Sequence, residues 1–161
     1  MRKISDLSSL VNMTATTVEG VGLGLLGVGL PDVVCFIGMI TRGAFELSLK
    51  YGYDYSLPEE KYFILKMIEV ALAKDEAWKS INDELDEFIE EPIYVSDGEI
   101  ERQMKRTAEA MALEMVMLKF VQGLPVIGVL GGISNPVYYG KIMSYVKLKY
   151  YKRYLVKKME E

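Results

Sequence analysis

Five charged residues lie within or beside the two most apolar stretches of the chain, and their types would support chemistry: Asp32, Arg42, Glu46, Glu114 and Lys119. Arg42 and Lys119 would bind a lipid headgroup or a small anion if their helices enclosed a polar pocket. Glu46 and Glu114 would act as general acid and base only if the fold placed them together, and nothing in the sequence indicates this. The alternative is that these charges form ion pairs or lie on solvated faces.

The composition removes several classes of reaction. The chain has no histidine, which excludes Ser/His and Cys/His nucleophile pairs and nearly every zinc site built from these residues. The single cysteine, Cys35, lies in an apolar run and is expected to be a small buried side chain. We therefore expect no metal and no cofactor, and any catalysis would depend on carboxylates, lysine, tyrosine or the backbone.

Basic and aromatic residues alternate in the C-terminal region, and together they are typical of a helix at the headgroup depth of an anionic membrane. The residues expected at this membrane surface are Lys147, Lys149, Tyr150, Lys152, Arg153 and Tyr154. A nucleic-acid surface is one alternative, but the net charge of −4 argues against it. The other alternative is a packed terminal helix whose lysines are solvated or face an acidic helix.

Two glycine-rich apolar segments, residues 18–41 and 120–140, must position these charges. The run 22–27 has the glycine spacing of a dinucleotide-binding loop, but a helix rather than a strand is expected before it and no βαβ pattern follows. Close helix packing is the favoured use of these glycines. Residues 120–140 carry no charge, yet prolines and polar residues would break a spanning helix. We expect a domain with a shallow, reversible membrane contact.

Hydrophobic periodicity predicts helices almost everywhere. The expected helices cover residues 5–17, 32–51 and 58–73, a fourth segment that ends at Pro92, a methionine-rich fifth that ends at Leu124-Pro125, and a last one beyond Asn135-Pro136. The short run 93–95 is too brief to imply a sheet. The sequence therefore predicts an all-α fold: a single compact helical domain, residues 1–161, of six to seven helices with two glycine-rich apolar segments.

The sequence also predicts where some helices end and which residues form their apolar sides. Gly52 is expected to end the second helix in a left-handed conformation. The pairs Ser56/Glu59 and Ser96/Glu99 are spaced as capping boxes for the next helices. The predicted stripes are Trp78, Ile81, Leu85 and Phe88 in the fourth helix; Ile100, Met104, Ala108, Met111, Met115 and Leu118 in the fifth; and Tyr139, Met143, Val146, Tyr150 and Tyr154 in the last.

A set of motifs is distributed along the chain. A glycine run ending in Leu30-Pro31-Asp32 precedes an apolar helix with Arg42 and Glu46. Tyr51-Gly52-Tyr53-Asp54 and Pro58-Glu59-Glu60 follow, and residues 124–132 with Asn135 and Gly140 complete the pattern. In combination, these motifs resemble the EcsC family, from about residue 10 to residue 155. Residues that match the family pattern, with no catalytic role assigned to any of them, are Pro31, Asp32, Arg42, Tyr53, Asp54, Pro125, Gly128 and Asn135.

The resemblance implies a bacterial, all-helical protein from a family named for a gene beside an ABC transporter and linked with protein secretion. This chain is short for the family and has an acidic region at residues 75–101, so partners of longer members do not transfer directly. We expect a non-enzymatic accessory protein, cytoplasmic or peripheral to the membrane, whose partner is an anionic membrane surface, a membrane transporter or another protein. The alternative is an enzyme or a domain that binds a small ligand or lipid headgroup between the glycine-rich helices.

Overall fold

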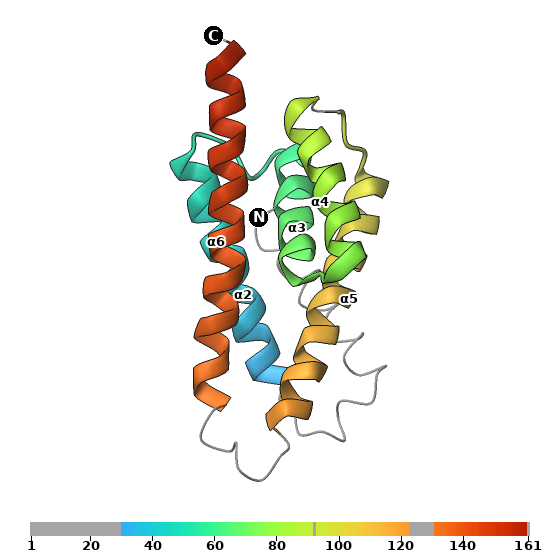
Figure 1. The fold of residues 1–161 in the computed structure, drawn as a ribbon, viewed down its shortest axis with the longest axis vertical. Helices are drawn as coiled ribbons and strands as arrows, with labels where there is room; N and C mark the ends of the chain where they lie inside the picture. The colour runs from blue at the N-terminus through green and yellow to red at the C-terminus, as the bar shows by residue number, and fades with distance from the viewer. Residues whose placement is uncertain (1–29, 92, 123–130, 161) are drawn as a thin grey trace.

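Five helices make up the part of the chain that the structure describes (Figure 1). The computed structural model describes residues 30–91, 93–122 and 131–160. The helices are α2 (Leu30–Lys50), α3 (Pro58–Leu72), α4 (Asp75–Glu90), α5 (Asp97–Gln122) and α6 (Gly131–Glu160). These ranges contain no strand, which confirms the all-α prediction for them. The predicted helix at 5–17, the glycine run 22–27 and the Leu124-Pro125 break lie outside the described residues, so the total of six to seven helices stays a prediction.

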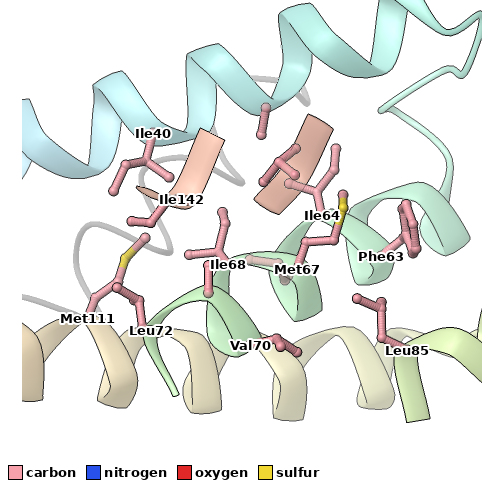
Figure 2. Close-up of a cluster of buried hydrophobic side chains, with 14 of the residues drawn as sticks. Ile40, Phe63, Ile64, Met67, Ile68, Val70, Leu72, Leu85, Met111 and Ile142 are labelled. Carbon is pink, nitrogen blue, oxygen red and sulfur yellow. The ribbon is translucent and has the colours of Figure 1, made fainter. Parts of the chain in front are cut away.

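Helix α3 is the centre of this bundle because most of its surface is apolar. All its residues from Phe63 to Leu72 are buried, and the two charged ones, Lys66 and Glu69, have polar partners. Helices α4, α5 and α6 pack against α3, and α2 packs against α6. Figure 2 shows the resulting core, in which Ile40 of α2, Met111 of α5 and Ile142 of α6 gather with Ile68 of α3.

The end of α2 follows the prediction. Gly52 has a φ of +83°, the left-handed conformation that glycine adopts without a steric penalty. This conformation turns the chain so that the N–H of Tyr53 donates to the carbonyl of Ser48 at 3.0 Å, which satisfies one of the free carbonyls at the end of the helix. The turn leads directly into α3 and brings Tyr53 back toward the bundle.

The capping box predicted at Ser56 and Glu59 is wrong. Helix α3 begins at Pro58, and its N-cap residue is Leu57, which makes no side-chain capping bond. Proline is favoured at the first helical position because its φ is already helical and its missing N–H would have no partner there. The N–H of Ser56 instead donates to Oδ1 of Asp54 at 2.9 Å, so this segment is fixed by an Asx turn.

The pair Ser96/Glu99 at the start of α5 is in hydrogen-bond contact, as its spacing predicts. Oε2 of Glu99 accepts from the N–H of Ser96 at 2.8 Å and from its hydroxyl at 2.7 Å, and these hydrogen bonds lower the pKa of Glu99. The methionine-rich stripe is confirmed where side chains are described, since Ala108 and Met111 are buried while Ile100 and Met104 pack at the edge of the core. In α4, by contrast, Trp78 is exposed, and Ile89 joins Leu85 and Phe88 in the core.

Helix α6 begins before the predicted start. It already includes Gly131 and carries Pro136 inside its first turns, so the proline does not mark the helix boundary. The predicted stripe is confirmed at Val146 and Tyr150, which are fully buried, but Tyr154 is exposed. The C-terminal end of α6 projects beyond the other helices in Figure 1. None of the helices in the described ranges is long and apolar enough to cross a membrane.

Candidate functional site

The five predicted pocket residues do not form one described cluster. Arg42 and Glu46 form an ion pair at 3.0 Å along the outside of α2, where their side chains are 83% and 56% exposed. Glu114 lies on α5 and pairs with Lys74 instead, at 2.8 Å. Asp32 and Lys119 belong to α2 and α5, but their side chains are outside the described set. Among the three residues of this group whose side chains are described, the structure brings together only Arg42 and Glu46.

Glu114 is a buried carboxylate with incomplete hydrogen bonding. It is only 5% exposed, and its Oε2 atom has no hydrogen-bond partner among the described residues. The hydrogen bond with Glu114 raises the pKa of Lys74. Burial first, and then the charge of Glu114, raises the pKa of the nearby Tyr138 hydroxyl. The Tyr138 hydroxyl of α6 therefore lies beside a carboxylate of α5 whose ion-pair partner among the described residues is a surface lysine.

The basic residues predicted for a membrane surface divide into two groups. Lys149 and Tyr150 are buried, while Arg153 and Lys152 form ion pairs with Glu60 and with Asp86 and Glu90. Lys149, Tyr150 and Arg153 face the bundle, because the rotation of α6 that buries Val146 also turns them inward. Lys152, whose side chain is 35% exposed, lies at the edge of the contact with α4. Only Lys147 and Tyr154 of the predicted set are exposed.

Lys149 and Lys152 join α6 to the acidic helix α4. Lys149 pairs closely with Asp86, and Lys152 lies 3.3 Å from Asp86 and 3.1 Å from Glu90. Burial acts to lower the pKa of Lys152, but its hydrogen bonds to the two carboxylates raise it overall. The hydroxyl of Tyr145 adds a hydrogen bond to Oδ1 of Asn82 at 2.8 Å. The charge asymmetry of the sequence is therefore partly an internal contact, as the alternative of a terminal helix facing an acidic helix predicted.

Glu60 is the centre of the most complete polar cluster. This carboxylate is 3% exposed, and it accepts from Nη1 of Arg153 at 2.6 Å and from the hydroxyl of Tyr150. Oγ of Ser48 lies 3.0 Å from Oε1 of Glu60 and 3.1 Å from the carbonyl oxygen of Tyr53, so its single proton is shared between the two acceptors. Residues from α2, α3 and α6 thus meet at one carboxylate.

Aromatic rings enclose this cluster. The guanidinium of Arg153 lies 4.0 Å from the ring centroid of Tyr53 and 4.8 Å from that of Phe63, which adds cation–π attraction to its ion pair. Tyr150 stacks on Tyr51 and Tyr53. Burial and the neighbouring Glu60 charge raise the pKa of the Tyr150 hydroxyl. The partners of Glu60 come from α2 and α6, so the cluster ties these helices to α3.

Sequence reasoning missed the role of Glu60 and Ser48. The sequence signal for a buried Glu60 is its spacing: Ile64 and Met67, which are buried, follow it by four and seven positions and so share its face of α3. An acidic residue that continues the apolar face of a helix is expected to have buried partners. Those partners are not local: Arg153 is 93 positions away from Glu60 in the chain.

Grooves on the described surface include two between or beside the helices. One lies between α2 and α6, has a volume of about 340 Å³, and is lined by Gly43, Glu46, Leu47, Lys50, Tyr139, Gly140, Met143, Ser144 and Lys147. The other, about 290 Å³, lies beside α3 and α4 and contains the buried Lys66, which pairs with Glu84 at 2.5 Å. The carboxylates of Glu84, Glu87 and Glu91 make the second groove acidic, whereas the first has lysines on both walls.

The residues of the family pattern have mostly structural surroundings. Tyr53 stacks with Tyr150, and burial raises the pKa of its hydroxyl. Asp54 accepts the Ser56 N–H. Pro31 and Asn135 lie in α2 and α6, but their side chains are not described, and Pro125 and Gly128 lie outside the described residues. Within the described ranges, no group of three acidic or cysteine side chains is placed to hold a metal ion.

Comparisons with known proteins agree with the pattern in the sequence. No curated protein and no solved structure is detectably similar to the chain. The family comparison, however, matches residues 2–155 to the EcsC protein family. Because this match covers nearly the whole sequence, the chain belongs to the EcsC protein family.

Proposed function

We propose that this protein is a non-enzymatic accessory factor that binds the surface of an anionic membrane through the outer side of α6. The observation that carries the proposal is a line of exposed side chains opposite the core stripe of that helix. We call it the outer α6 face. It comprises Val137, Lys141, Ser144, Leu148, Tyr151, Leu155 and Met159.

The spacing of these residues shows that they share one side of the helix. They recur at intervals of three and four positions, which is the period of an α-helical face. Ile142, Val146 and Tyr150, which are fully buried, lie on the opposite side. Apolar side chains therefore occur on both sides of α6, and only one of these sides is covered by the described bundle.

The chemistry of the outer α6 face fits an anionic bilayer better than a purely apolar partner. Leu148, Tyr151 and Leu155 are exposed large side chains that would enter the headgroup region, where tyrosine is favoured. Lys141 and Lys147 are exposed on or beside the face and have no ion-pair partner among the described residues. Each such lysine would contribute about 1 kcal/mol near an anionic surface, and the apolar residues would add the hydrophobic part.

The position of α6 also favours this contact. Its C-terminal end projects beyond the other helices (Figure 1), so a flat surface reaches it without meeting the acidic helix α4 first. Because Lys149 and Lys152 pair with α4, they reduce the negative charge next to the proposed surface. Both lysines are paired with carboxylates of α4, so their role differs from that of the exposed Lys147.

A matched pair of leucines tests the proposal by flotation with liposomes. Leu148 on the outer α6 face and Leu113 on α5 are both 60% exposed. We expect Leu148→Glu to reduce binding to anionic liposomes at least tenfold, because it places a carboxylate at an apolar, negatively charged surface. Leu113→Glu should leave binding unchanged. Equal losses in the two variants, or no binding of the wild-type protein to anionic liposomes, would refute the proposal.

A further inference from the structure

The groove between α2 and α6 has features of a binding site that the core contacts do not use. Its two walls come from separate helices: Gly43, Leu47 and Lys50 from α2, and Gly140, Ser144 and Lys147 from α6. The volume of about 340 Å³ is at the lower end of the range for small-molecule sites. Lys147 also lies beside the outer α6 face, so the groove opens next to the surface proposed to meet the membrane.

The polar groups of the groove are mostly donors. Lys50 and Lys147 supply an ammonium group from each wall, and neither has an ion-pair partner among the described residues. Tyr139 and Ser144 add hydroxyl groups. Ammonium groups and hydroxyls on opposite walls suit a compact, doubly charged anion whose oxygens accept several hydrogen bonds at once.

Glu46 is the one acidic residue in the lining, and it does not cancel this preference. Its carboxylate already accepts from Nε of Arg42 at 3.0 Å, so that pair is close to neutral as a unit. The two lysines then leave the groove with a net positive charge. Leu47 and Met143 supply apolar lining that would contact the carbon skeleton next to a phosphate.

We propose that the groove between α2 and α6 binds a phosphate monoester, with Lys50 and Lys147 holding the phosphate from opposite walls. The source of the phosphate is a lipid headgroup or a free phosphate ester, which share this chemistry. The lipid source rests on the proposed membrane function, because the groove lies beside the outer α6 face. Binding of a free ester does not depend on that function.

The two glycines of the groove differ in a way that provides a test of occupancy. A Cβ atom at Gly43 would lie 2.6 Å from Oη of Tyr139 and 2.7 Å from Sδ of Met143, whereas nothing lies within 4 Å of a Cβ at Gly140. A larger side chain at Gly43 would therefore displace the groove wall. At Gly140 it enters open space, so Gly140→Leu is expected to occupy the groove without disturbing the helices.

The first experiment measures binding of glycerol 3-phosphate to the full chain by calorimetry or NMR titration, with glycerol as the uncharged control. We expect Lys50→Gln to weaken binding about tenfold, as loss of a hydrogen bond to a charged group implies. Gly140→Leu should abolish it. Lys105→Gln, which removes an exposed lysine of α5, should leave it unchanged. Equal effects of Lys50→Gln and Lys105→Gln would overturn the proposal for a free ester.

The second experiment identifies the source by comparing vesicles that contain phosphatidic acid with phosphatidylserine vesicles of matched surface charge. Stronger binding to phosphatidic acid that Lys50→Gln reduces to the phosphatidylserine level would support a lipid headgroup. Ester binding in the first experiment without this preference would assign the site to a free phosphate ester. If neither experiment depends on Lys50, the groove proposal fails, and the response of Leu148→Glu on phosphatidylserine vesicles still tests the membrane function separately.

Discussion

Two buried carboxylates, Glu60 and Glu114, show opposite ways of placing an acid inside this bundle. Glu60 is 3% exposed and has close polar partners on α2 and α6. Glu114 is nearly as buried, but its ion-pair partner Lys74 has a side chain that is 60% exposed, and one of its oxygens has no partner among the described residues. Burial alone therefore does not make a carboxylate a structural anchor. The number of its partners and their burial decide this role.

The largest effect is expected at Glu60. Glu60→Gln would leave the guanidinium of Arg153 without its carboxylate while its side chain is only 16% exposed. Removing one partner of a buried ion pair typically costs about 3–5 kcal/mol. We expect the free energy of unfolding, measured by urea denaturation, to fall by that amount. Glu59→Gln, one position earlier in α3, should cost less than about 1 kcal/mol.

A double variant sharpens this prediction. If the cost arises from the unpaired Arg153, then Glu60→Gln combined with Arg153→Met should be less destabilising than the sum of the two single changes. Additive losses would show that the ion pair is not what makes Glu60 an anchor. The contrast with Glu114 would then have to come from the hydrogen bonds of Tyr150 and Ser48.

The next largest effect on stability is expected at Tyr150, whose hydroxyl donates a hydrogen bond to the same carboxylate. Burial first, and then Glu60, raises the pKa of its hydroxyl above the ordinary value of 10.0. The folded protein therefore keeps this proton when the unfolded chain has lost it. The contribution to stability is fully present below pH 10 and falls as the pH rises above it, by about 1.4 kcal/mol per pH unit for one group.

The measurement is urea denaturation between pH 9 and pH 11.5. Tyr150→Phe should lower stability at neutral pH by about 1–3 kcal/mol, since Glu60 loses a donor, and should also make the alkaline decline shallower. Tyr94→Phe, at a tyrosine that is 81% exposed, should change neither quantity. An alkaline slope that is identical in the wild type and Tyr150→Phe would contradict the assignment of the pKa shift.

The features that the sequence predicted correctly are local ones. The span of α3, the left-handed Gly52 and the Ser96/Glu99 cap depend on residues a few positions apart, which is the range over which periodicity and capping patterns act. The Ser56/Glu59 box failed because Pro58 supplied an equally local and stronger start signal. The start of α6 was predicted beyond Pro136, but the helix begins at Gly131 and contains this proline near its N-terminal end.

The candidate sites could be predicted less well because they depend on pairing between distant segments. Lys149 was predicted to lie at a membrane surface because basic and aromatic residues alternate in the last helix, yet Asp86, 63 positions away, pairs with it inside the bundle. The predicted stripe of Val146 and Tyr150 implies an exposed side of α6 opposite to it, but the residues predicted for the membrane surface included Lys149 and Tyr150, which are buried. The groove between α2 and α6 could not be predicted, because no sequence pattern in α2 indicates that α6 packs beside it.

The smallest effect is expected at Glu114, and it tests the comparison directly. Glu114→Gln loses an ion pair to a lysine that solvent already screens, which is worth less than about 1 kcal/mol. It also removes negative charge from an oxygen without a described partner, and this opposes the loss. We therefore expect urea denaturation to show a change in unfolding free energy within about 1 kcal/mol, with Lys74→Gln giving a similar result. A loss as large as that of Glu60→Gln would show that the two carboxylates are anchors of the same kind.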